Sequence, residues 1–358
     1  MAGITGAAPS WDPPQGDGHG AKACENEVAL KRYAAVWGLW EGRAMARWTA
    51  ADIPDLSGRE AVVTGANSGL GFQTALELAR HGARVVMACR DQGRGAQAVD
   101  RVRELAPGAE VELGALDLAD LASVRRFAAW YRERREGEGL DLLVNNAGVM
   151  AIPHRRTADG FEMQLGTNHL GHFALTGLLL PLLVARPGAR VVTVSSIAHR
   201  AGWISFGNLQ RERWYERWTA YGQAKLANVL FAFELQRRAD AAGVDLLSMA
   251  AHPGYAATNL QAVGPQMSGA RLSARLFDAA NRVVAQSGAQ GALPSLYAAT
   301  SPDARGGAYY GPDGAGEVRG YPTRVKAARR AYDERTARRL WQVSEGLTGV
   351  CYDILTNC

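Results

Sequence analysis

From Arg59 onward, short apolar runs rich in valine alternate with longer segments in which apolar residues recur at helical spacing. The short runs predict buried strands, because a strand covered on both faces shows no polar alternation. We expect seven strands, at residues 61–64, 84–89, 111–116, 141–145, 190–195, 244–250 and 307–310. The segments between them predict helices near residues 70–81, 92–106, 119–136, 162–185, 219–242, 280–299 and 324–346.

This alternation predicts βαβ units around a parallel sheet. Right-handed crossovers then give an α/β, Rossmann-type fold: a doubly wound parallel seven-stranded sheet in a single domain over residues 57–346. A ligand should bind at the carboxyl ends of the strands, where the strand order reverses. Residues 1–56 form an N-terminal extension, whose first 20 residues are rich in glycine and proline and should be disordered, and residues 347–358 form a C-terminal tail.

A glycine-rich turn follows the first predicted strand, with glycine at positions 65, 69 and 71. Glycine lets the backbone turn tightly and approach a pyrophosphate, and the following helix offers free N–H groups at its start. An ordinary tight turn is the alternative, but the position in a βαβ series favours nucleotide binding. The G-x-x-x-G-x-G spacing differs from the G-x-G-x-x-G of other dinucleotide folds, and the turn lacks the Lys-Ser/Thr pair of a triphosphatase loop.

The end of the second predicted strand indicates which nicotinamide cofactor binds. An acidic residue there would hydrogen-bond to a ribose 2′-hydroxyl, whereas an arginine would pair with a 2′-phosphate. Cys89 and Arg90 occupy this position, so NADP (NADPH) is expected rather than NAD. The neighbouring Asp91 argues in the other direction.

Tyr221 and Lys225 stand four residues apart at the start of a predicted helix and therefore share one of its faces. A phenol with a pKa of about 10 is a poor acid–base catalyst at neutral pH. A neighbouring ammonium and the positive charge of the cofactor both favour the phenolate, so we expect the pKa of Tyr221 to be lowered. Lysine is rare in this chain, which makes the pairing suggestive without being decisive.

Two further strand ends carry polar residues. Ser195 and Ser196 follow the fifth predicted strand, where a hydroxyl can hold a substrate carbonyl oxygen beside Tyr221. The fourth strand ends in the segment 145–148, Asn-Asn-Ala-Gly. A cap or a polar turn would explain either segment alone, and the choice between Ser195 and Ser196 stays open.

Together, these motifs resemble the short-chain dehydrogenase/reductase family. The resemblance covers about residues 57–346 and rests on Thr64–Gly71, Asn145–Gly148, Ser196, Tyr221–Lys225 and Pro253-Gly254, in that order. Within the family, the sequence is similar to retinol-dehydrogenase-like and protochlorophyllide-reductase-like proteins, through the segments 65–71, 87–91 and 167–173.

The resemblance implies a role for each matching position. Tyr221 would exchange a proton with the substrate oxygen, while Lys225 would lower the pKa of Tyr221 and bind the nicotinamide ribose. Ser196 would orient the substrate oxygen, and Asn168 would hold a water that links Lys225 to solvent. These four are the implied catalytic residues.

The resemblance also implies a set of cofactor contacts. Asp117 would lie near the adenine, Asn145 against the adenine-side ribose, and Thr258 at the nicotinamide amide. The full implied set is Gly65, Asn67, Ser68, Gly69, Leu70, Gly71, Arg90, Asp117, Leu118, Asn145, Ala147, Gly148, Tyr221, Lys225, Pro253, Gly254 and Thr258.

The segment before Tyr221 is rich in aromatic residues. It contains Trp203, Ile204, Phe206, Trp214, Tyr215 and Trp218, and should form an apolar substrate pocket over the nicotinamide, although core packing or a subunit contact would use the same residues. Residues 260–280 are similar to the lid that the family closes over its substrate, with a plain loop as the alternative.

Composition narrows the function further. The net charge of +5 is dispersed along the chain, so we expect no nucleic-acid partner. His169 and His172 lack a third ligand, the cysteines form no C-x-x-C pair, and we expect no metal. We also expect no membrane span and no secretory signal, which favours a cytoplasmic protein, although residues 28–48 could lie on a membrane surface.

The sequence therefore predicts an NADP(H)-dependent oxidoreductase that interconverts an apolar alcohol and its aldehyde or ketone. The alternatives are an inactive nucleotide-binding regulator or scaffold of the same fold and a serine hydrolase, which would need a G-x-S-x-G elbow that the sequence lacks. A homodimer through the helices near 162–185 and 219–242 is an option. The substrate and the physiological direction are left open.

Overall fold

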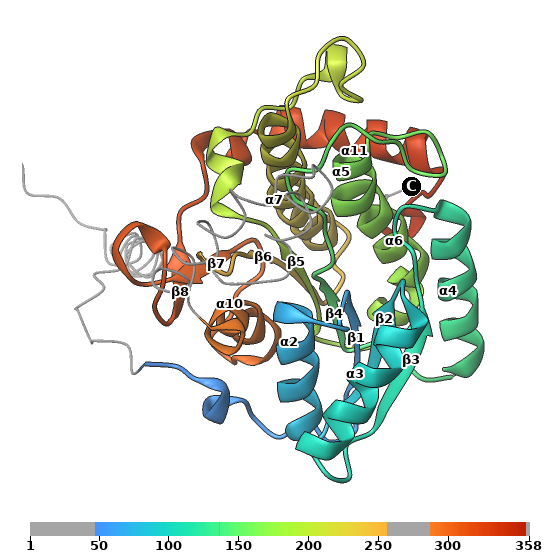
Figure 1. Ribbon diagram of the computed structural model, residues 1–358, viewed down its shortest axis with the longest axis vertical. Helices are drawn as coiled ribbons and strands as arrows, with labels where there is room; N and C mark the ends of the chain where they lie inside the picture. The colour runs from blue at the N-terminus through green and yellow to red at the C-terminus, as the bar shows by residue number, and fades with distance from the viewer. Residues whose placement is uncertain (1–46, 136, 256–286, 356–358) are drawn as a thin grey trace, which may run out of the picture. The chain divides into compact units, whose positions relative to one another are not determined.

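A parallel sheet with helices on both faces forms the centre of the computed structural model, which describes residues 47–135, 137–255 and 287–355 (Figure 1). Its eight strands lie in the order β3-β2-β1-β4-β5-β6-β7-β8. Their bounds are β1 Glu60–Thr64, β2 Arg84–Cys89, β3 Val111–Ala115, β4 Leu142–Asn145, β5 Ala189–Val194, β6 Leu246–Ala251, β7 Tyr309–Pro312 and β8 Pro322–Val325. Neighbouring strands pair in parallel from β3 to β7, and β7 pairs with β8 antiparallel.

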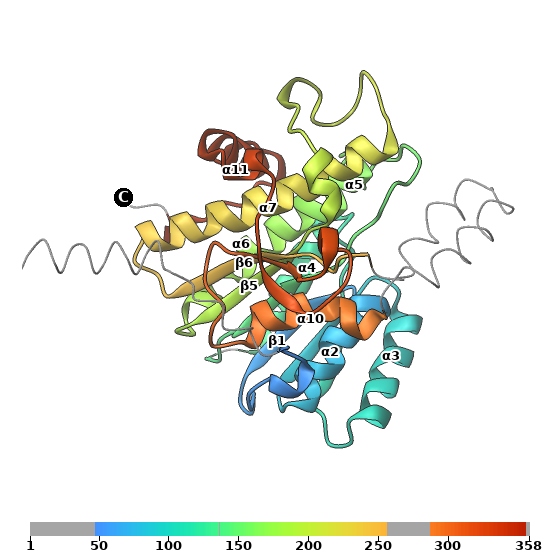
Figure 2. The same cartoon turned by 90° about the vertical axis from the view of Figure 1, so that its left-hand side faces the viewer.

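The helices cover the two faces of this sheet (Figure 2). The longer ones are α2 Gly69–Arg80, α3 Gln92–Leu105, α4 Leu121–Arg134, α6 Gly171–Val184, α7 Arg217–Ala241, α10 Gly288–Thr300 and α11 Glu334–Thr348. The short ones are η1 Ala50–Asp52, α5 Met163–Leu165, η2 Gly166–Leu170, η3 Ile197–Ala201, η4 Phe206–Asn208, η5 Ala315–Glu317, η6 Arg329–Tyr332 and η7 Asp353–Leu355.

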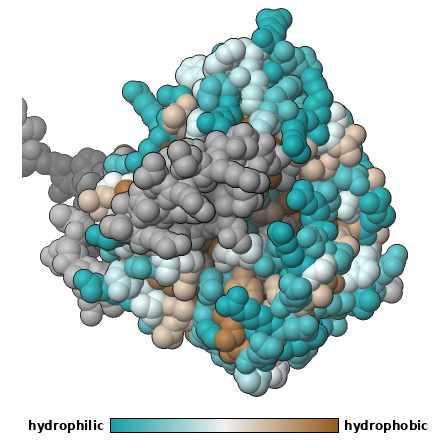
Figure 3. All heavy atoms as spheres, viewed as in Figure 1, coloured by the Kyte–Doolittle hydropathy of each residue, from teal (hydrophilic) through white to brown (hydrophobic). Residues whose placement is uncertain are grey.

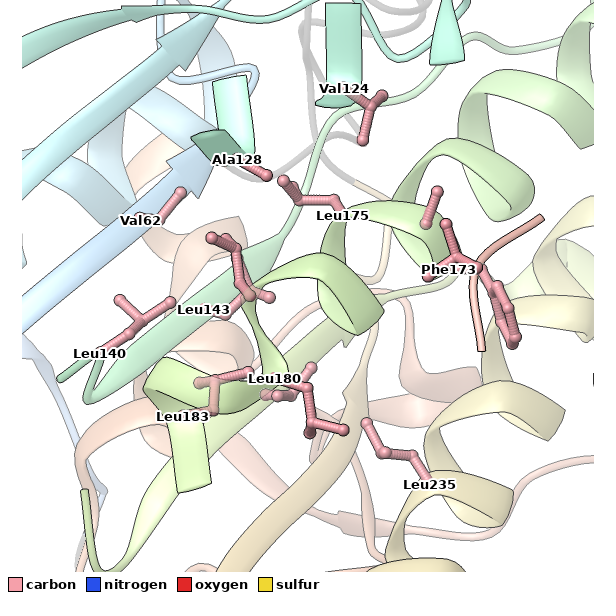
Figure 4. Close-up of a cluster of buried hydrophobic side chains, with 14 of the residues drawn as sticks. Val62, Val124, Ala128, Leu140, Leu143, Phe173, Leu175, Leu180, Leu183 and Leu235 are labelled. Atoms are coloured by element: carbon pink, nitrogen blue, oxygen red, sulfur yellow. The ribbon is translucent and has the colours of Figure 1, made fainter. Parts of the chain in front are cut away.

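Each face of the sheet has its own hydrophobic core. All five residues of β1 are buried, and their side chains alternate between the faces: Ala61 and Val63 pack with residues of α2, α3 and α10, whereas Val62 packs with residues of α4, α6 and α7. Figure 4 shows Val62 in the second cluster, together with Leu143, Leu175 and Leu180. Burial on both faces explains why the strands contain continuous apolar runs.

The strand order reverses between β1 and β4, whose carboxyl ends lie side by side. The Asn146 side chain joins them, because its Nδ2 atom donates to the Thr64 carbonyl at 2.7 Å. The backbone N–H groups of Asn146 and Ala147 both donate to the Thr64 hydroxyl oxygen at 2.9 Å. The predicted doubly wound fold is therefore confirmed, with its switch point at the glycine-rich turn.

The predicted strand count was one short, and the last predicted helix began too early. Residues 322–325 form β8, whose register pairs Tyr309 with Val325 and Pro312 with Pro322. The helix expected from residue 324 begins at Glu334, where the Asp333 side chain accepts hydrogen bonds from the N–H groups of Arg335 and Thr336. The basic, alanine-rich sequence after Arg324 has helical composition, but pairing with β7 keeps Arg324 and Val325 extended, and residues 329–332 form only the short helix η6.

The predicted fourth helix is interrupted. Residues 162–185 contain α5, a π-helical turn (η2) and α6 in place of one continuous α-helix. The stretch Met163–Val184 has the length and composition of a membrane-crossing helix, but 67% of its most apolar window is buried inside the domain. The residues drawn in teal in Figure 3 show that the face seen there is largely hydrophilic.

Residues 349–355 pack against the helix layer. Tyr352 is buried and donates from its hydroxyl to the Phe173 carbonyl at 2.7 Å. Trp341 of α11 packs against Tyr352, with 4.5 Å between ring centroids, and both contact Phe173 and Phe231. The segment expected to be a tail thus completes the core over α6 and α7, the two helices considered for subunit pairing.

Candidate active site

The glycine-rich turn has a backbone that only glycine adopts readily. Gly65 and Gly69 have φ angles of 65° and 58°, in the left-handed region. A Cβ atom on Gly71 would collide with the Asn146 side chain and the Gly65 carbonyl. Ser68 is the N-cap of α2 and makes no side-chain capping hydrogen bond within the described chain, so the first N–H groups of the helix have no side-chain partner there.

These features fit the pyrophosphate of a dinucleotide. The turn brings backbone close to the switch point without an intervening side chain, and the start of a 12-residue helix supplies N–H donors and positive potential. Asn67, Ser68 and Leu70 of the same turn are half-buried, so they line an accessible surface.

Arg90 at the end of β2 is exposed, and among the described residues no hydrogen bond or ion pair engages its side chain. Asp91 is already occupied: its carboxylate caps α3 by accepting from Arg94 N–H at 3.0 Å and lies 3.5 Å from Arg94 Nε. Cys89 is buried, and desolvation raises the pKa of its thiol to about 11. The only charged group at this strand end without a partner in the described chain is thus a cation.

The remaining predicted cofactor contacts divide into accessible and buried positions. Asp117, Ala147 and Gly148 are half-buried at strand ends, whereas Leu118 is buried. Asn145 is fully buried, and its Nδ2 atom donates to the Thr176 hydroxyl on α6 at 3.0 Å. This contact holds the Asn145 amide against α6.

Ser196 and Tyr221 are brought together by the start of η3 and the first turns of α7. The Ser196 hydroxyl lies close enough to the Tyr221 phenol to lower the pKa of Tyr221. Ser196 is half-buried, and its hydroxyl accepts from Ala198 N–H at 3.2 Å as the cap of η3. Ser195 is directed elsewhere: it is buried, and its hydroxyl donates to the Lys225 carbonyl at 2.7 Å. Of the two serines, Ser196 faces the tyrosine.

Lys225 lies under the Tyr221 ring, with 5.8 Å between its Nζ atom and the ring centroid. Nζ donates to the Val194 carbonyl at 3.0 Å. Desolvation lowers the pKa of Lys225 to about 8. Desolvation also raises the pKa of Tyr221 to about 12, and the nearby Ser196 hydroxyl opposes this shift.

In the chain alone the pKa of Tyr221 is raised, and the lowering expected with the cofactor bound stays a prediction. Tyr221 is 4% exposed, so burial penalises the phenolate more than the surroundings stabilise it. At neutral pH the phenol holds its proton.

Asn168 and Lys225 both have side chains close to Gly148. It lies in the π-helical turn η2, and such turns are frequent at functional sites. Its amide pairs with both backbone groups of Val149, at 2.8 and 2.9 Å. A Cβ atom on Gly148 would lie 3.0 Å from Asn168 Oδ1 and 3.6 Å from Lys225 Nζ, so the three residues meet at one point.

Three of the residues before Tyr221 are exposed rather than enclosed. Trp203, Trp214 and Trp218 are 64%, 57% and 51% exposed, and Ile204 is buried. Trp218 packs edge-on against the Tyr221 ring, with 6.3 Å between centroids. The segment thus places at least one aromatic side chain beside the tyrosine.

Several predicted positions lie outside the described residues. Pro253 and Gly254 are described and half-buried, but Thr258, the segment 260–280 expected to form a lid, and the first 20 residues are not.

His169 and His172 are both buried core residues. His172 donates from Nδ1 to the Asn168 carbonyl at 3.0 Å and lies 2.9 Å from the Thr64 hydroxyl through Nε2. His169 contacts the Ser344 hydroxyl at 2.9 Å. Within the described ranges, no three His, Cys, Asp or Glu side chains gather as a metal site would require.

Sequence reasoning missed His252, Glu317 and Arg200, which lie behind the Pro253-Gly254 turn. Arg200 and Glu317 are 117 positions apart, and no motif links them. Of these three residues, only His252 could have been singled out from the sequence, because it comes directly after β6 and before Pro253.

A doubly wound sheet with a glycine turn at its switch point defines a nucleotide-binding α/β protein. The sequence profile described as short chain dehydrogenase matches residues 59–268. Retinol dehydrogenase 14 of Mus musculus is 40% identical over 307 residues, which is 82% of this chain and 87% of that protein.

Two solved structures show the same relationship. A protein of unknown function from Mycobacterium paratuberculosis is 46% identical, with a TM-score of 0.70 over 86% of this chain and 99% of that chain. The complex of Pseudomonas aeruginosa RhlG with NADP is 25% identical, with a TM-score of 0.54 over 71% of this chain and 94% of that chain. The chain belongs to the short-chain dehydrogenase family, in the branch of retinol-dehydrogenase-like proteins.

Proposed function

We propose that this protein is an NADP(H)-dependent oxidoreductase that interconverts an apolar alcohol and its aldehyde or ketone, with Tyr221 as general acid and base. The proposal depends on one observation: the side chains of Ser196, Tyr221 and Lys225 lie together. Lys225 also lies close to Gly148, at the switch point of the sheet. A nucleotide-binding protein without chemistry has no need for a buried amine beneath a buried phenol.

The chain offers a continuous set of cofactor contacts. The glycine turn would hold the pyrophosphate, Arg90 would pair with the 2′-phosphate, and Lys225 would bind the nicotinamide ribose. Among the described residues Arg90 has no partner while Asp91 is engaged by Arg94, and both observations support NADP over NAD. When bound, the cofactor supplies or accepts the hydride.

In the chain alone, the Tyr221 phenol is in its protonated form, which can donate a proton but cannot accept one. With its pKa raised to about 12 by burial, the phenol is protonated at neutral pH and can donate to a carbonyl oxygen. Ser196, whose hydroxyl lies beside the Tyr221 phenol, would hold that oxygen in line with the phenol proton. In the reverse direction Tyr221 would accept the alcohol proton, which requires the positive charges of Lys225 and of the oxidised cofactor to lower its pKa.

An apolar substrate is supported by the side chains next to Tyr221. Trp218 contacts the phenol ring edge-on and offers a broad apolar surface at the entrance to the site. The similar proteins named retinol dehydrogenases act on retinol, an apolar alcohol, which is consistent with this substrate class.

The substitution Tyr221→Phe tests the mechanism. It should lower kcat for NADPH-dependent reduction of lipophilic aldehydes by about 10³-fold or more, because it removes the proton donor. NADPH affinity, measured by fluorescence titration, should stay within about twofold. Tyr332→Phe, which changes a half-exposed tyrosine away from the site, is the matched control.

Turnover by Tyr221→Phe at the wild-type rate would exclude the mechanism. An inactive regulator or scaffold is the second reading, and it predicts NADPH binding with no turnover by the wild-type protein across a panel of aldehydes, ketones and quinones.

A further inference from the structure

Three side chains behind the catalytic group form a hydrogen-bonded chain, here called the Glu317 chain: Arg200, Glu317 and His252. Glu317 ends η5 in the connection between β7 and β8. Its Oε1 atom accepts from the Arg200 guanidinium at 2.6 Å, and its Oε2 atom lies 3.0 Å from His252 Nε2. The His252 side chain is fully buried and Glu317 is 21% exposed.

The hydrogen-bond partners fix the role of each group in this chain. The backbone N–H of Gly254 donates to His252 Nδ1 at 3.2 Å, so that nitrogen carries no proton. The ring proton is therefore on Nε2, which donates to Glu317. The hydrogen bonds from His252 and Arg200 hold the pKa of Glu317 below its usual value, so its carboxylate is ionised and accepts from both sides.

The backbone on both sides of the contact is constrained. Glu317 has a φ angle of 58°, a left-handed conformation that is unfavourable for a residue with a Cβ atom. Gly254 has a φ angle of 66°, and a Cβ atom there would collide with the Val318 carbonyl. Tyr255 N–H donates to that same carbonyl at 2.7 Å. The Pro253-Gly254 turn therefore rests directly on residues 317–318.

At its other end, the Glu317 chain is connected to the short helix that begins at Ser196. Arg200 lies in η3, the short helix capped by Ser196. The same helix is held by His199, which donates from Nδ1 to the Ser196 carbonyl at 2.7 Å and accepts from Ala328 N–H at Nε2. Glu317 thus joins the segment that carries Ser196 to the turn that follows β6.

We propose that Glu317 is a positioning residue that fixes the Pro253-Gly254 turn relative to Ser196 and thereby sets the affinity of the site for the nicotinamide end of NADP(H). This inference rests on the proposed function. It requires a carboxylate, because both partners are hydrogen-bond donors. An amide of the same size would turn its NH₂ group toward one of them and leave a donor facing a donor.

The substitution Glu317→Gln tests the proposal with little change of volume. NADPH affinity should fall about tenfold, and KM for NADPH should rise by the same factor, while kcat and the melting temperature change little. In the protein without nucleotide, the Gly254 and Tyr255 amides should exchange hydrogen about tenfold faster. Glu334→Gln is the matched control, because Glu334 pairs with Arg338 at 2.9 Å on the exposed face of α11.

A second variant separates the two ends of the chain. His252→Leu removes both the donor to Glu317 and the acceptor for Gly254 N–H while leaving the Arg200–Glu317 pair in place, so it should raise exchange at Gly254 and weaken NADPH binding as Glu317→Gln does. Unchanged exchange at Gly254 and NADPH affinity within twofold of wild type in Glu317→Gln would overturn the proposal. Faster exchange throughout the domain, with a lower melting temperature, would also overturn it, because the role would then be structural.

The readouts distinguish this proposal from the proposed function. Absence of carbonyl turnover by the wild-type protein would count against the enzyme, whereas the NADPH titration would still decide the role of Glu317. A wild-type protein that binds no NADPH would overturn the affinity claim together with the proposed function, and the exchange of Gly254 would show whether Glu317 holds the turn.

Discussion

The Nζ atom of Lys225 lies 5.8 Å from the centre of the Tyr221 ring, one helical turn away along α7. It is held there by the Val194 carbonyl, 3.0 Å away at the end of β5. Both side chains are almost completely buried, so the charge of the ammonium is expensive in the folded state. This cost has measurable consequences for stability and for cofactor binding.

Lys225→Met should stabilise the protein at neutral pH. Burial lowers the pKa of Lys225 from its ordinary 10.5 to about 8, so below pH 8 the folded state carries a buried charge that the unfolded state solvates freely. The penalty should shrink as pH rises from 8 to 10.5, because the folded lysine loses its proton first. Chemical unfolding at pH 7 should show a gain of about 1–3 kcal/mol for Lys225→Met, which becomes smaller at pH 10. An equal effect at both pH values would contradict this explanation.

NADPH binding should weaken as pH rises through about 8. The ammonium form of Lys225 would attract the anionic cofactor and donate hydrogen bonds to its ribose, and the neutral amine offers neither charge nor three donors. Fluorescence titrations between pH 6.5 and 9.5 should show this decline in the wild-type protein. Lys225→Met should bind more weakly at low pH, and the decline near pH 8 should be absent.

Ser196→Ala and Ser195→Ala should have different effects. Ser196 lies beside the Tyr221 phenol and would orient the substrate oxygen, so its loss should reduce kcat by about 10²-fold. Ser195 donates to the Lys225 carbonyl, so its loss should cost about 1 kcal/mol of stability and change kcat far less. Steady-state kinetics with urea unfolding curves would separate the two, and the reverse order of kcat values would assign the catalytic role to Ser195.

Arg90→Ala should reduce the preference for NADPH over NADH. Arg90, which has no partner among the described residues, would pair with the 2′-phosphate, so its removal should raise KM for NADPH by about 10–100-fold and leave KM for NADH nearly unchanged. Arg94→Ala is the matched control, because Arg94 is also exposed and lies on the neighbouring segment but is paired with Asp91. Parallel kinetics with both cofactors would check this, and a preference that does not change in Arg90→Ala would contradict the assignment.

Trp341→Ala should destabilise the domain by about 3–5 kcal/mol. The indole is 2% exposed and contacts Phe173, Phe231 and Tyr352, and the Arg238 guanidinium lies 4.4 Å from its ring centroid. Leu105→Ala, at a half-exposed position, is the control and should cost less than 1 kcal/mol. Equilibrium unfolding in urea measures both. A loss below 1 kcal/mol for Trp341→Ala would show that α11 is dispensable for the core.

The parallel strands were predictable because each buried strand contains a continuous apolar run, as in Ala61–Val63 and Val85–Ala88. The glycine turn and the Tyr221–Lys225 pair were predictable because they depend on neighbours close in sequence. The choice between Ser195 and Ser196 was not, since it depends on which hydroxyl faces the Tyr221 phenol and which one faces the Lys225 carbonyl. β8 was missed because its only support is pairing with β7, a contact between segments.

The direction of the Tyr221 pKa shift could not be predicted from the sequence, for a different reason. The sequence reveals that a lysine is near, but not that both groups are buried, and burial decides the direction of the shift. Glu317 has no local signal, because its partners Arg200 and His252 come from distant parts of the chain. Such contacts can be found only after the fold has brought the segments together.

Val350, Tyr352 and Leu355 lie in the same core as Phe173. The end of the described chain is therefore an unsuitable place for a truncation or a direct fusion. Shortening the gene at residue 346 would uncover aromatic rings on α6 and α7, and the product should precipitate or associate through them. An affinity handle or fluorescent fusion joined directly after Leu355 would strain the same packing, so a flexible spacer is advisable on that side. If subunits do assemble, they must meet through a surface other than the one that α11 already covers.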